Sequence, residues 1–197
     1  MGLEFSDPYA PLPAGLPVPV DDGACRHLVG MTLPAITLQS SNNRAVDLSQ
    51  IAFRERTVLF FFPAAGRPGV PDPTGWSLIP GARGCTPQLC DYRDATSEFQ
   101  KRGIRLFGVS SQRHEDLVEI AHRNRLQYEL LSHEELRLTK ALRLPTFKVQ
   151  SPFGLVPPVC IRRLSLVVGK GRIEKVFYPV FPPNKNASEV LAYLKES

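Results

Sequence analysis

Gly84-Cys85-Thr86-Pro87-Gln88-Leu89-Cys90-Asp91-Tyr92-Arg93-Asp94 is the most informative stretch of this chain. It follows a strand-like run and opens a helical pattern, in which apolar side chains recur from Leu89 to Phe99 and stop before Gly103. The start of a helix presents unpaired backbone N–H groups and the positive end of the helix dipole, and both favour a thiolate over a thiol. Cys85 is therefore a candidate nucleophile.

The second cysteine of this stretch, Cys90, lies five residues further along the same predicted helix. In an intact helix the two Cα atoms would be roughly 8–9 Å apart, whereas a disulfide requires less than about 7 Å. A bond between them therefore requires the first turns of the helix to unwind. This wide spacing is unlike that of a Cys-x-x-Cys exchanger. It suits a cysteine that a peroxide first oxidises to a sulfenic acid. A second thiol then condenses with this sulfenic acid to form a disulfide. We predict Cys85 as the first to be oxidised and Cys90 as its resolving partner.

Composition indicates one globular domain with an ordinary core, since the 197 residues are 43% hydrophobic and 22% charged. Four unevenly spaced cysteines, without a charged start followed by an apolar run, favour a reducing, cytoplasmic location. The net charge of +5 comes from scattered Lys and Arg residues, so nucleic-acid binding is not expected. The longest apolar run, Val58 to Phe62, is too short to cross a membrane.

Proline distribution divides the chain into a Pro-rich N-terminal arm, residues 1–27, and a folded domain, residues 28–197. Within the domain the pattern alternates strands and helices and ends with a hairpin and a helix, which predicts a mixed central sheet with helices on both faces. The predicted strands are 35–38, 45–48, 57–62, 104–109, 128–131, 163–168 and 173–180. Two helices are predicted over residues 85–102 and 114–126. A third is predicted to begin at a capping box over Ser132–Glu135, and a fourth to begin with Asn186 as its N-cap. Irregular segments are expected between Pro63 and Gly84 and over Gln150–Pro158.

The longer run Ile79-Pro80-Gly81-Ala82-Arg83-Gly84-Cys85-Thr86-Pro87-Gln88-Leu89-Cys90-Asp91-Tyr92-Arg93-Asp94 resembles the active-site helix of peroxiredoxins, the AhpC/TSA superfamily. Gly108-Val109-Ser110, Leu33-Pro34-Ala35-Ile36-Thr37-Leu38 and Phe61-Phe62-Pro63 extend the resemblance to about Leu28 to Leu194. The type is similar to the bacterioferritin-comigratory, or Q-type, group, in which the resolving cysteine lies five residues after the peroxidatic one. The resemblance implies a thioredoxin-like fold, a three-layer α/β/α arrangement with an N-terminal hairpin.

The resemblance also implies a function and a set of site residues. It implies a thiol peroxidase that reduces hydrogen peroxide and organic hydroperoxides, with a thioredoxin-like protein as reductant and a monomer or homodimer as the assembly. The run Arg163-Leu164-Ser165-Leu166-Val167-Val168 matches a family pattern whose arginine holds the thiolate, so that role falls to Arg163. Arg162 would point to the other side of a strand. Pro63, Gly84 and Thr86 are the expected substrate-binding residues.

The chain departs from the family pattern just before Cys85. Leu78 stands where the family has a proline, and Ala82 stands where it has a Thr or Ser. We expect Pro63 to keep the role of the family's proline, with the segment Ala64–Pro80 inserted between Pro63 and Cys85. Thr86, Thr74 and Ser77 are the candidates for the missing hydroxyl. The insertion is expected to gate the pocket or to build a dimer contact.

Two further cysteines and four histidines complete the inventory of reactive side chains. Cys160 is predicted to pack in the core, and Cys25 to be an exposed thiol of the arm. The histidines have no metal-binding spacing with the cysteines, so neither a metal nor a cofactor is expected.

Two alternative functions remain open at this point. One is a redox-responsive binding protein without enzymatic activity, and the other is a protein thiol–disulfide oxidoreductase.

Overall fold

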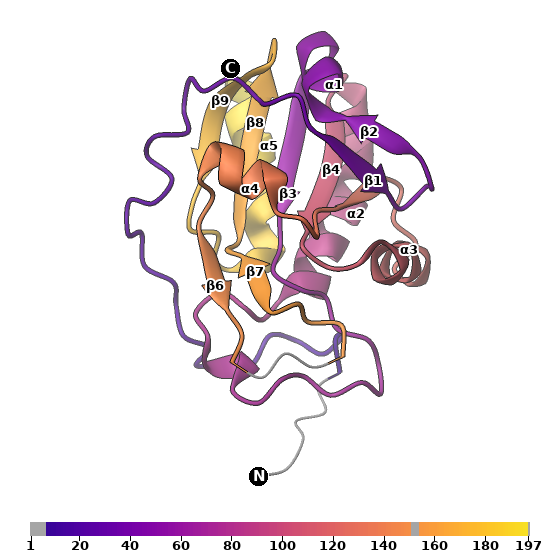
Figure 1. The fold of residues 1–197 in the computed structure, drawn as a ribbon, viewed down its shortest axis with the longest axis vertical. Helices are drawn as coiled ribbons and strands as arrows, with labels where there is room; N and C mark the ends of the chain where they lie inside the picture. The colour runs from indigo at the N-terminus through magenta and orange to yellow at the C-terminus, as the bar shows by residue number, and fades with distance from the viewer. Residues whose placement is uncertain (1–6, 151–153, 197) are drawn as a thin grey trace.

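The protein folds around a seven-stranded mixed sheet, as seen in the computed structural model, which describes residues 7–150 and 154–196 (Figure 1). The strand order is β2-β1-β5-β4-β3-β8-β9, in which β3, β4 and β5 run parallel and the other neighbouring pairs run antiparallel. The strands are β1 Thr37–Ser40, β2 Ala45–Asp47, β3 Thr57–Phe61, β4 Arg105–Ser110, β5 Glu129–Ser132, β6 Thr146–Lys148, β7 Val159–Ile161, β8 Leu164–Gly169 and β9 Arg172–Phe177. Strands β6 and β7 form a separate pair.

Five α-helices and two short 3₁₀ helices complete the described elements. They are α1 Leu48–Arg54, η1 Trp76–Leu78, α2 Cys85–Lys101, α3 His114–Arg123, α4 Arg137–Leu142, η2 Pro183–Lys185 and α5 Asn186–Glu196. The thioredoxin-like three-layer α/β/α fold predicted from the resemblance is confirmed.

The central strands are buried on both faces, as their unbroken apolar runs predict. Along β3, Leu59 and Phe61 belong to the core cluster that α1 and α4 cover, whereas Val58 and Phe60 belong to the cluster that α2, α3 and α5 cover. The alternation follows from the two-residue period of a strand. This places α2, with Cys85 at its start, against one face of the sheet.

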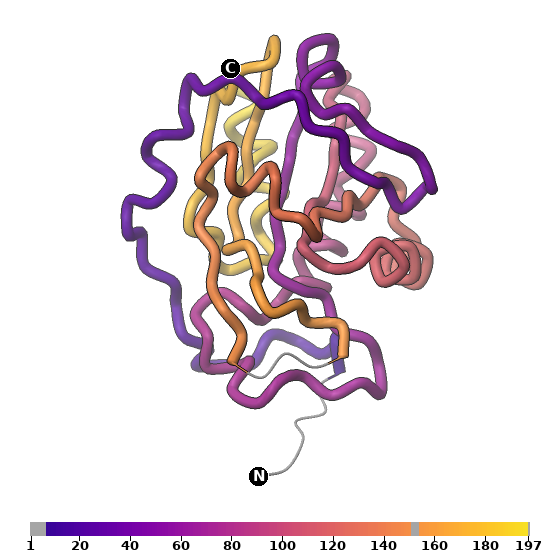
Figure 2. The backbone as a smooth tube through the Cα atoms, viewed as in Figure 1, coloured from indigo at the N-terminus to yellow at the C-terminus, as the bar shows by residue number. Residues whose placement is uncertain are grey.

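The N-terminal arm crosses the molecule and reaches the outer edge of the sheet, as the backbone trace in Figure 2 shows. The segment that directly follows the arm covers the edge strand β9, because Gly30 and Leu33 donate backbone hydrogen bonds to the carbonyls of Ile173 and Gly171. Residues 1–6 of the arm, and Ser197 at the other end of the predicted domain, lie outside the described residues.

Several sequence predictions differ from the structure. Helix α1 was missed because Asp47, predicted inside a strand, is its N-cap and accepts the N–H groups of Ser49 and Gln50. Strands β6 and β7 were missed because each has only three residues. The predicted irregular segment Gln150–Pro158 includes residues 151–153, which lie outside the described residues.

The capping box predicted at Ser132–Glu135 is wrong. Ser132 is the last residue of β5, and its hydroxyl donates to the carbonyl of Gln112. The N-cap of α4 is Leu136, which makes no side-chain cap. His133 caps the helix instead, because its Nε2 accepts the backbone N–H of Thr139, in the first turn of α4, at 3.0 Å. Burial lowers the pKa of His133 to about 4, so the ring is neutral and able to accept this bond.

Candidate active site

Cys85 is the first residue of α2, where a sharp turn brings the chain into the helix. Gly84 before it has φ of 96°, a left-handed conformation that favours glycine. A Cβ at Gly84 would lie 2.4 Å from Pro183 Cγ and 3.0 Å from Leu12 Cδ2, so a side chain has no room there. The turn leaves the Cys85 side chain only 3% exposed, at the base of a cavity.

Arg163 is the charged partner of the Cys85 thiol. Its Nη2 lies 3.2 Å from Cys85 Sγ and also donates to the carbonyls of Gly81, Ala82 and Arg83 at 3.1–3.2 Å. Arg163 is 3% exposed, so its guanidinium interacts with the sulfur under little solvent screening. Arg163 lies one residue before β8, rather than inside the strand as predicted. Its neighbour Arg162 is half-buried and donates its backbone N–H to the carbonyl of Pro145, away from the thiol.

Buried polar side chains hold the other end of Arg163. Arg163 Nη1 donates to Gln88 Oε1, and Gln88 Nε2 donates to Asn186 Oδ1 at 3.0 Å. The same Asn186 oxygen accepts from Tyr92 at 2.9 Å and from Ser165 at 2.6 Å. Gln88 and Asn186 are fully buried, so the network has few alternative arrangements.

Four residues of this buried network were not predicted as site residues: Gln88, Asn186, Tyr92 and Ser165. Gln88 carried a usable signal, because it lies three residues after Cys85 and therefore near it on the helix surface, beside the buried Leu89 and Tyr92. The prediction that Asn186 caps the last helix is wrong, since Asn186 lies inside the helical backbone after η2 and its side chain is used by the buried network.

Cys90 is half-buried on the intact helix α2. It is a free thiol, as are the three other cysteines. Burial raises the pKa of Cys90 above its usual value, and Arg93 opposes that shift in part. Cys90 is therefore a thiol at neutral pH.

The cysteines outside α2 are both buried. Cys160 packs in the core as predicted, between β6 and the segment that contains Trp76. Cys25 was predicted as an exposed thiol, and this is wrong, because it is 5% exposed and packs with Leu28 and Leu33 in the main core. Burial raises the pKa of each of these two thiols to about 12, so both are poor nucleophiles.

The expected substrate-binding residues lie at different depths around the thiol. Gly84 and Thr86 line the cavity beside Cys85. Pro63 is buried at the end of β3 and its carbonyl accepts from Ser110, whereas the next residue, Ala64, lines the cavity. The roles of these residues stay predictions.

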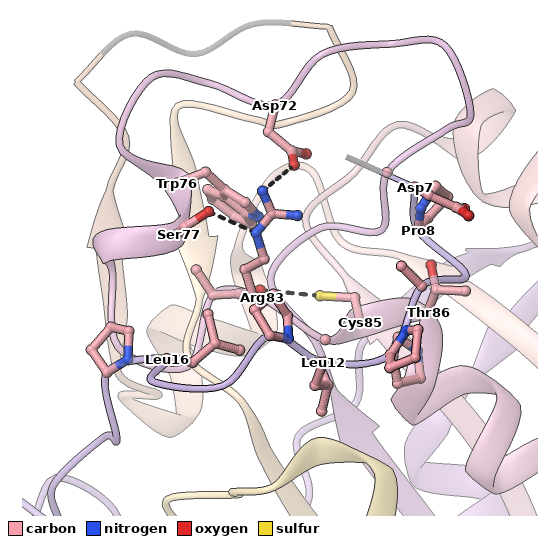
Figure 3. A pocket seen from close by; sticks show the side chains of 18 of the residues that line it. Asp7, Pro8, Leu12, Leu16, Asp72, Trp76, Ser77, Arg83, Cys85 and Thr86 are labelled. Atoms are coloured by element: carbon pink, nitrogen blue, oxygen red, sulfur yellow. Dashed lines mark hydrogen bonds and ion pairs between the residues drawn. The ribbon is translucent and has the colours of Figure 1, made fainter. Parts of the chain in front are cut away.

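The segment Ala64–Pro80 forms a wall of the cavity (Figure 3). Its Trp76 is buried against Phe147, with ring centroids 6.0 Å apart. Asp72 pairs with Arg83 at 3.0 Å, and Arg83 Nε donates to Ser77 Oγ at 2.8 Å. The Ser77 hydroxyl is thus an acceptor for Arg83. Thr86, which lines the cavity in the first turn of α2, is the better placed of the predicted replacement hydroxyls.

Within the part of the chain that the structure describes, no three His, Cys, Asp or Glu side chains gather in an arrangement that could hold a metal ion. No described helix is long and apolar enough to span a membrane.

Comparison with known proteins gives the same architecture and a consistent set of relatives. The chain is 27% identical over 194 residues to the chloroplastic peroxiredoxin Q of Sedum lineare, covering 98% of this chain and 92% of that protein. It is 28% identical over 166 residues to the chloroplastic peroxiredoxin Q of Arabidopsis thaliana, covering 84% of this chain and 66% of that one.

Among solved structures, the Mycobacterium tuberculosis peroxidoxin BcpB superposes with a TM-score of 0.66 at 23% identity, covering 85% of this chain and 96% of its own. A cysteine-to-serine mutant of Xylella fastidiosa PrxQ has a TM-score of 0.65 at 21% identity, with coverage of 85% and 95%. These structures share the fold of this chain.

A family model described as Redoxin matches residues 28–194, most of the chain. The chain therefore belongs to the Redoxin family.

Proposed function

We propose that this protein is a thiol peroxidase that reduces hydrogen peroxide and organic hydroperoxides to water or an alcohol. The observation that carries the proposal is the 3.2 Å contact between Cys85 Sγ and Arg163 Nη2 at the base of a cavity. The relatives named peroxiredoxin Q support it. So does a Xanthomonas campestris bacterioferritin comigratory protein of the same fold, whose structures were solved in work on its alkyl peroxide reduction activity. The two alternative functions raised from the sequence are not favoured.

In the first step the Cys85 thiolate attacks one oxygen of the peroxide. The S–O bond forms as the O–O bond breaks, so Cys85 becomes a sulfenic acid and the other oxygen leaves, takes up a proton and departs as water or alcohol. The negative charge moves from sulfur to the leaving oxygen. A fixed guanidinium stabilises that charge wherever it lies along this path. Arg163 also has a buried Nε–H without a partner among the described residues, which leaves a donor for a bound oxygen.

In the second step Cys90 attacks the sulfenic acid of Cys85. A disulfide forms and the sulfenic oxygen leaves as water. A thioredoxin-like dithiol protein would then reduce the disulfide by thiol–disulfide exchange and regenerate both thiols. We further propose a cytoplasmic location and a monomer or homodimer as the working form.

The test is rapid mixing of reduced protein with peroxide, followed by the fluorescence of Trp76, the single tryptophan of the chain, which lines the cavity. Cys85→Ser should abolish the signal and the turnover, and Cys90→Ser should retain one oxidation but lose recycling by a thioredoxin system. Arg163→Met should slow the oxidation about a hundredfold or more, as expected for loss of a charged donor.

Arg162→Met is the matched control, because it removes the same charge one residue away. Equal losses in the two arginine variants, or undiminished oxidation in Cys85→Ser, would contradict the proposal.

A further inference from the structure

The described part of the N-terminal arm lies over the thiol. Almost half of the residues that line the Cys85 cavity, about 480 Å³ in volume, come from the arm segment 7–17. The others come from the Ala64–Pro80 insertion and from the residues around the start of α2. Figure 3 shows Cys85 among Leu12, Thr86 and Arg83. The arm is therefore a wall of the cavity that contains the reactive sulfur.

The arm is fastened near both ends of this wall. Near its start, the Tyr9 hydroxyl accepts from Arg123 Nη1 at 2.9 Å, and the guanidinium stands 5.7 Å from the centre of the Tyr9 ring. Arg123 also donates to the carbonyl of Gly66 at 2.8 Å, which ties the arm to the insertion. After it, Pro19 lies next to Gly81, where an added Cβ would be 3.6 Å from Pro19 Cγ. Leu12 in between packs against Gly84, so the segment has a defined place over the cavity.

The cavity has a polar base and apolar sides. Cys85, with Arg163 bonded to it, provides the base. Three charged residues line the wall: Asp72 and Arg83 are paired with each other, and Asp7 accepts the backbone N–H of Tyr9. Leu12 and Leu16 come from the arm. Trp76 and Leu78 come from the insertion, and Leu78 leaves 78% of its surface exposed at the rim. A ligand that suits this shape has a polar reactive end and an apolar remainder.

We propose that Leu12 and Leu16 are specificity-determining residues, which make the pocket select hydroperoxides with an apolar alkyl or aryl substituent over hydrogen peroxide. This inference rests on the proposed peroxidase function. The O–O group is placed at Cys85 and the substituent lies against the two leucines. Removing the substituent from water gives the larger ligand a binding advantage that hydrogen peroxide does not have.

The experiment uses the full-length reduced protein and two probes, cumene hydroperoxide and hydrogen peroxide, each mixed rapidly with protein to give the second-order rate constant of Cys85 oxidation. The test variant is Leu12→Gln combined with Leu16→Gln. The matched control is Val18→Gln combined with Val20→Gln, two changes in the same arm at side chains that are 62% and 81% exposed and do not line the cavity. Circular dichroism and thermal unfolding verify that both variants are folded.

We expect the ratio of the cumene hydroperoxide constant to the hydrogen peroxide constant to fall about tenfold in the leucine variant, within the range that lost apolar contacts give. The hydrogen peroxide constant should stay within about twofold, and the valine control should match the wild type. An unchanged ratio would overturn the proposal, and so would a parallel rise of both constants, which would make the arm a simple cover. Failure of the peroxidase function itself is distinguishable, because then neither probe would oxidise Cys85 in the wild type.

Discussion

At the scale of single residues, the chemistry depends on how firmly Arg163 is held against Cys85. A long arginine side chain loses considerable rotational freedom when it is fixed. Here the carbonyls before α2 hold one nitrogen, and Gln88, itself held by Asn186, holds another. Gln88 is therefore a positioning residue that acts on the peroxide through the guanidinium.

Replacing Gln88 by methionine, which has a similar length but no amide, tests this role. We expect the rate constant for oxidation by hydrogen peroxide to fall about tenfold, because the guanidinium loses a buried acceptor and its fixed orientation. Alkylation of Cys85 by iodoacetamide should fall less, since that reaction has no leaving oxygen for the guanidinium to stabilise. Rapid mixing measures the first reaction and mass spectrometry the second.

Gln100→Met, an exposed change on the same helix, is the control and should alter neither rate. Equal losses in the two reactions would mean that Gln88 acts only on the availability of the thiol.

At the scale of elements, α2 is both the catalytic platform and the part that must change. Intact helix geometry separates Cys85 and Cys90 by more than a disulfide allows, so the oxidised protein needs unwound first turns. We expect backbone amides over residues 86–91 to lose protection from hydrogen exchange when the disulfide forms. Mass spectrometry of the peptide that spans α2 measures this.

Cys90→Ser treated with one equivalent of peroxide is the control, because it forms the sulfenic acid without the disulfide and should keep its protection. Retained protection in a protein shown by mass to carry the disulfide would rule out the unwinding.

The rate of disulfide formation should depend on pH. Burial raises the pKa of Cys90, so its reactive thiolate is scarce at neutral pH and increases about tenfold per pH unit below that pKa. We expect Trp76 fluorescence to show a second phase that is independent of peroxide concentration and accelerates steadily from pH 6 to pH 9. A second phase with a flat pH profile would show that the unwinding itself limits the rate.

The elements also show what the sequence could predict. Helix α2 and the central strands were predicted because a helical apolar pattern and unbroken apolar runs each specify one structure. The contact between Cys85 and Arg163 came from the family resemblance alone, since the residues lie 78 positions apart. Local signals failed at two helix starts. At α4 the cap comes from the imidazole of His133, a residue type that the capping-box pattern does not include, instead of Ser132. At α5 the Asn186 side chain bonds to distant residues, Gln88 among them, instead of capping its own helix. No local pattern predicts such partners.

At the scale of the whole molecule, the contact between α2 and α5 includes a half-buried acid, Asp91, next to the resolving cysteine. Asp91 accepts the N–H of Ala187 in the first turn of α5 at 2.8 Å. Burial raises the pKa of Asp91 to about 6, and this bond opposes the rise only in part. The folded protein thus holds this proton up to about pH 6, whereas the unfolded chain releases it near pH 3.8. Stability must therefore fall as pH rises through this window.

Asp91→Asn should remove this loss, because the amide keeps an acceptor for Ala187 but carries no charge. A pKa rise from 3.8 to about 6 corresponds to a loss of at most about 3 kcal/mol in the free energy of unfolding. Partial contact of the carboxylate with solvent reduces this loss. We therefore expect the variant to be about 1–2 kcal/mol more stable than the wild type at pH 7.5 and equal to it at pH 4. Urea unfolding of reduced protein at both pH values measures this, with the exposed Asp94→Asn as control. Equal gains at both pH values would refute the linkage. An ionised Asp91 thus lowers the stability of the fold at neutral pH, at a position beside the turns that have to unwind before Cys90 can reach Cys85.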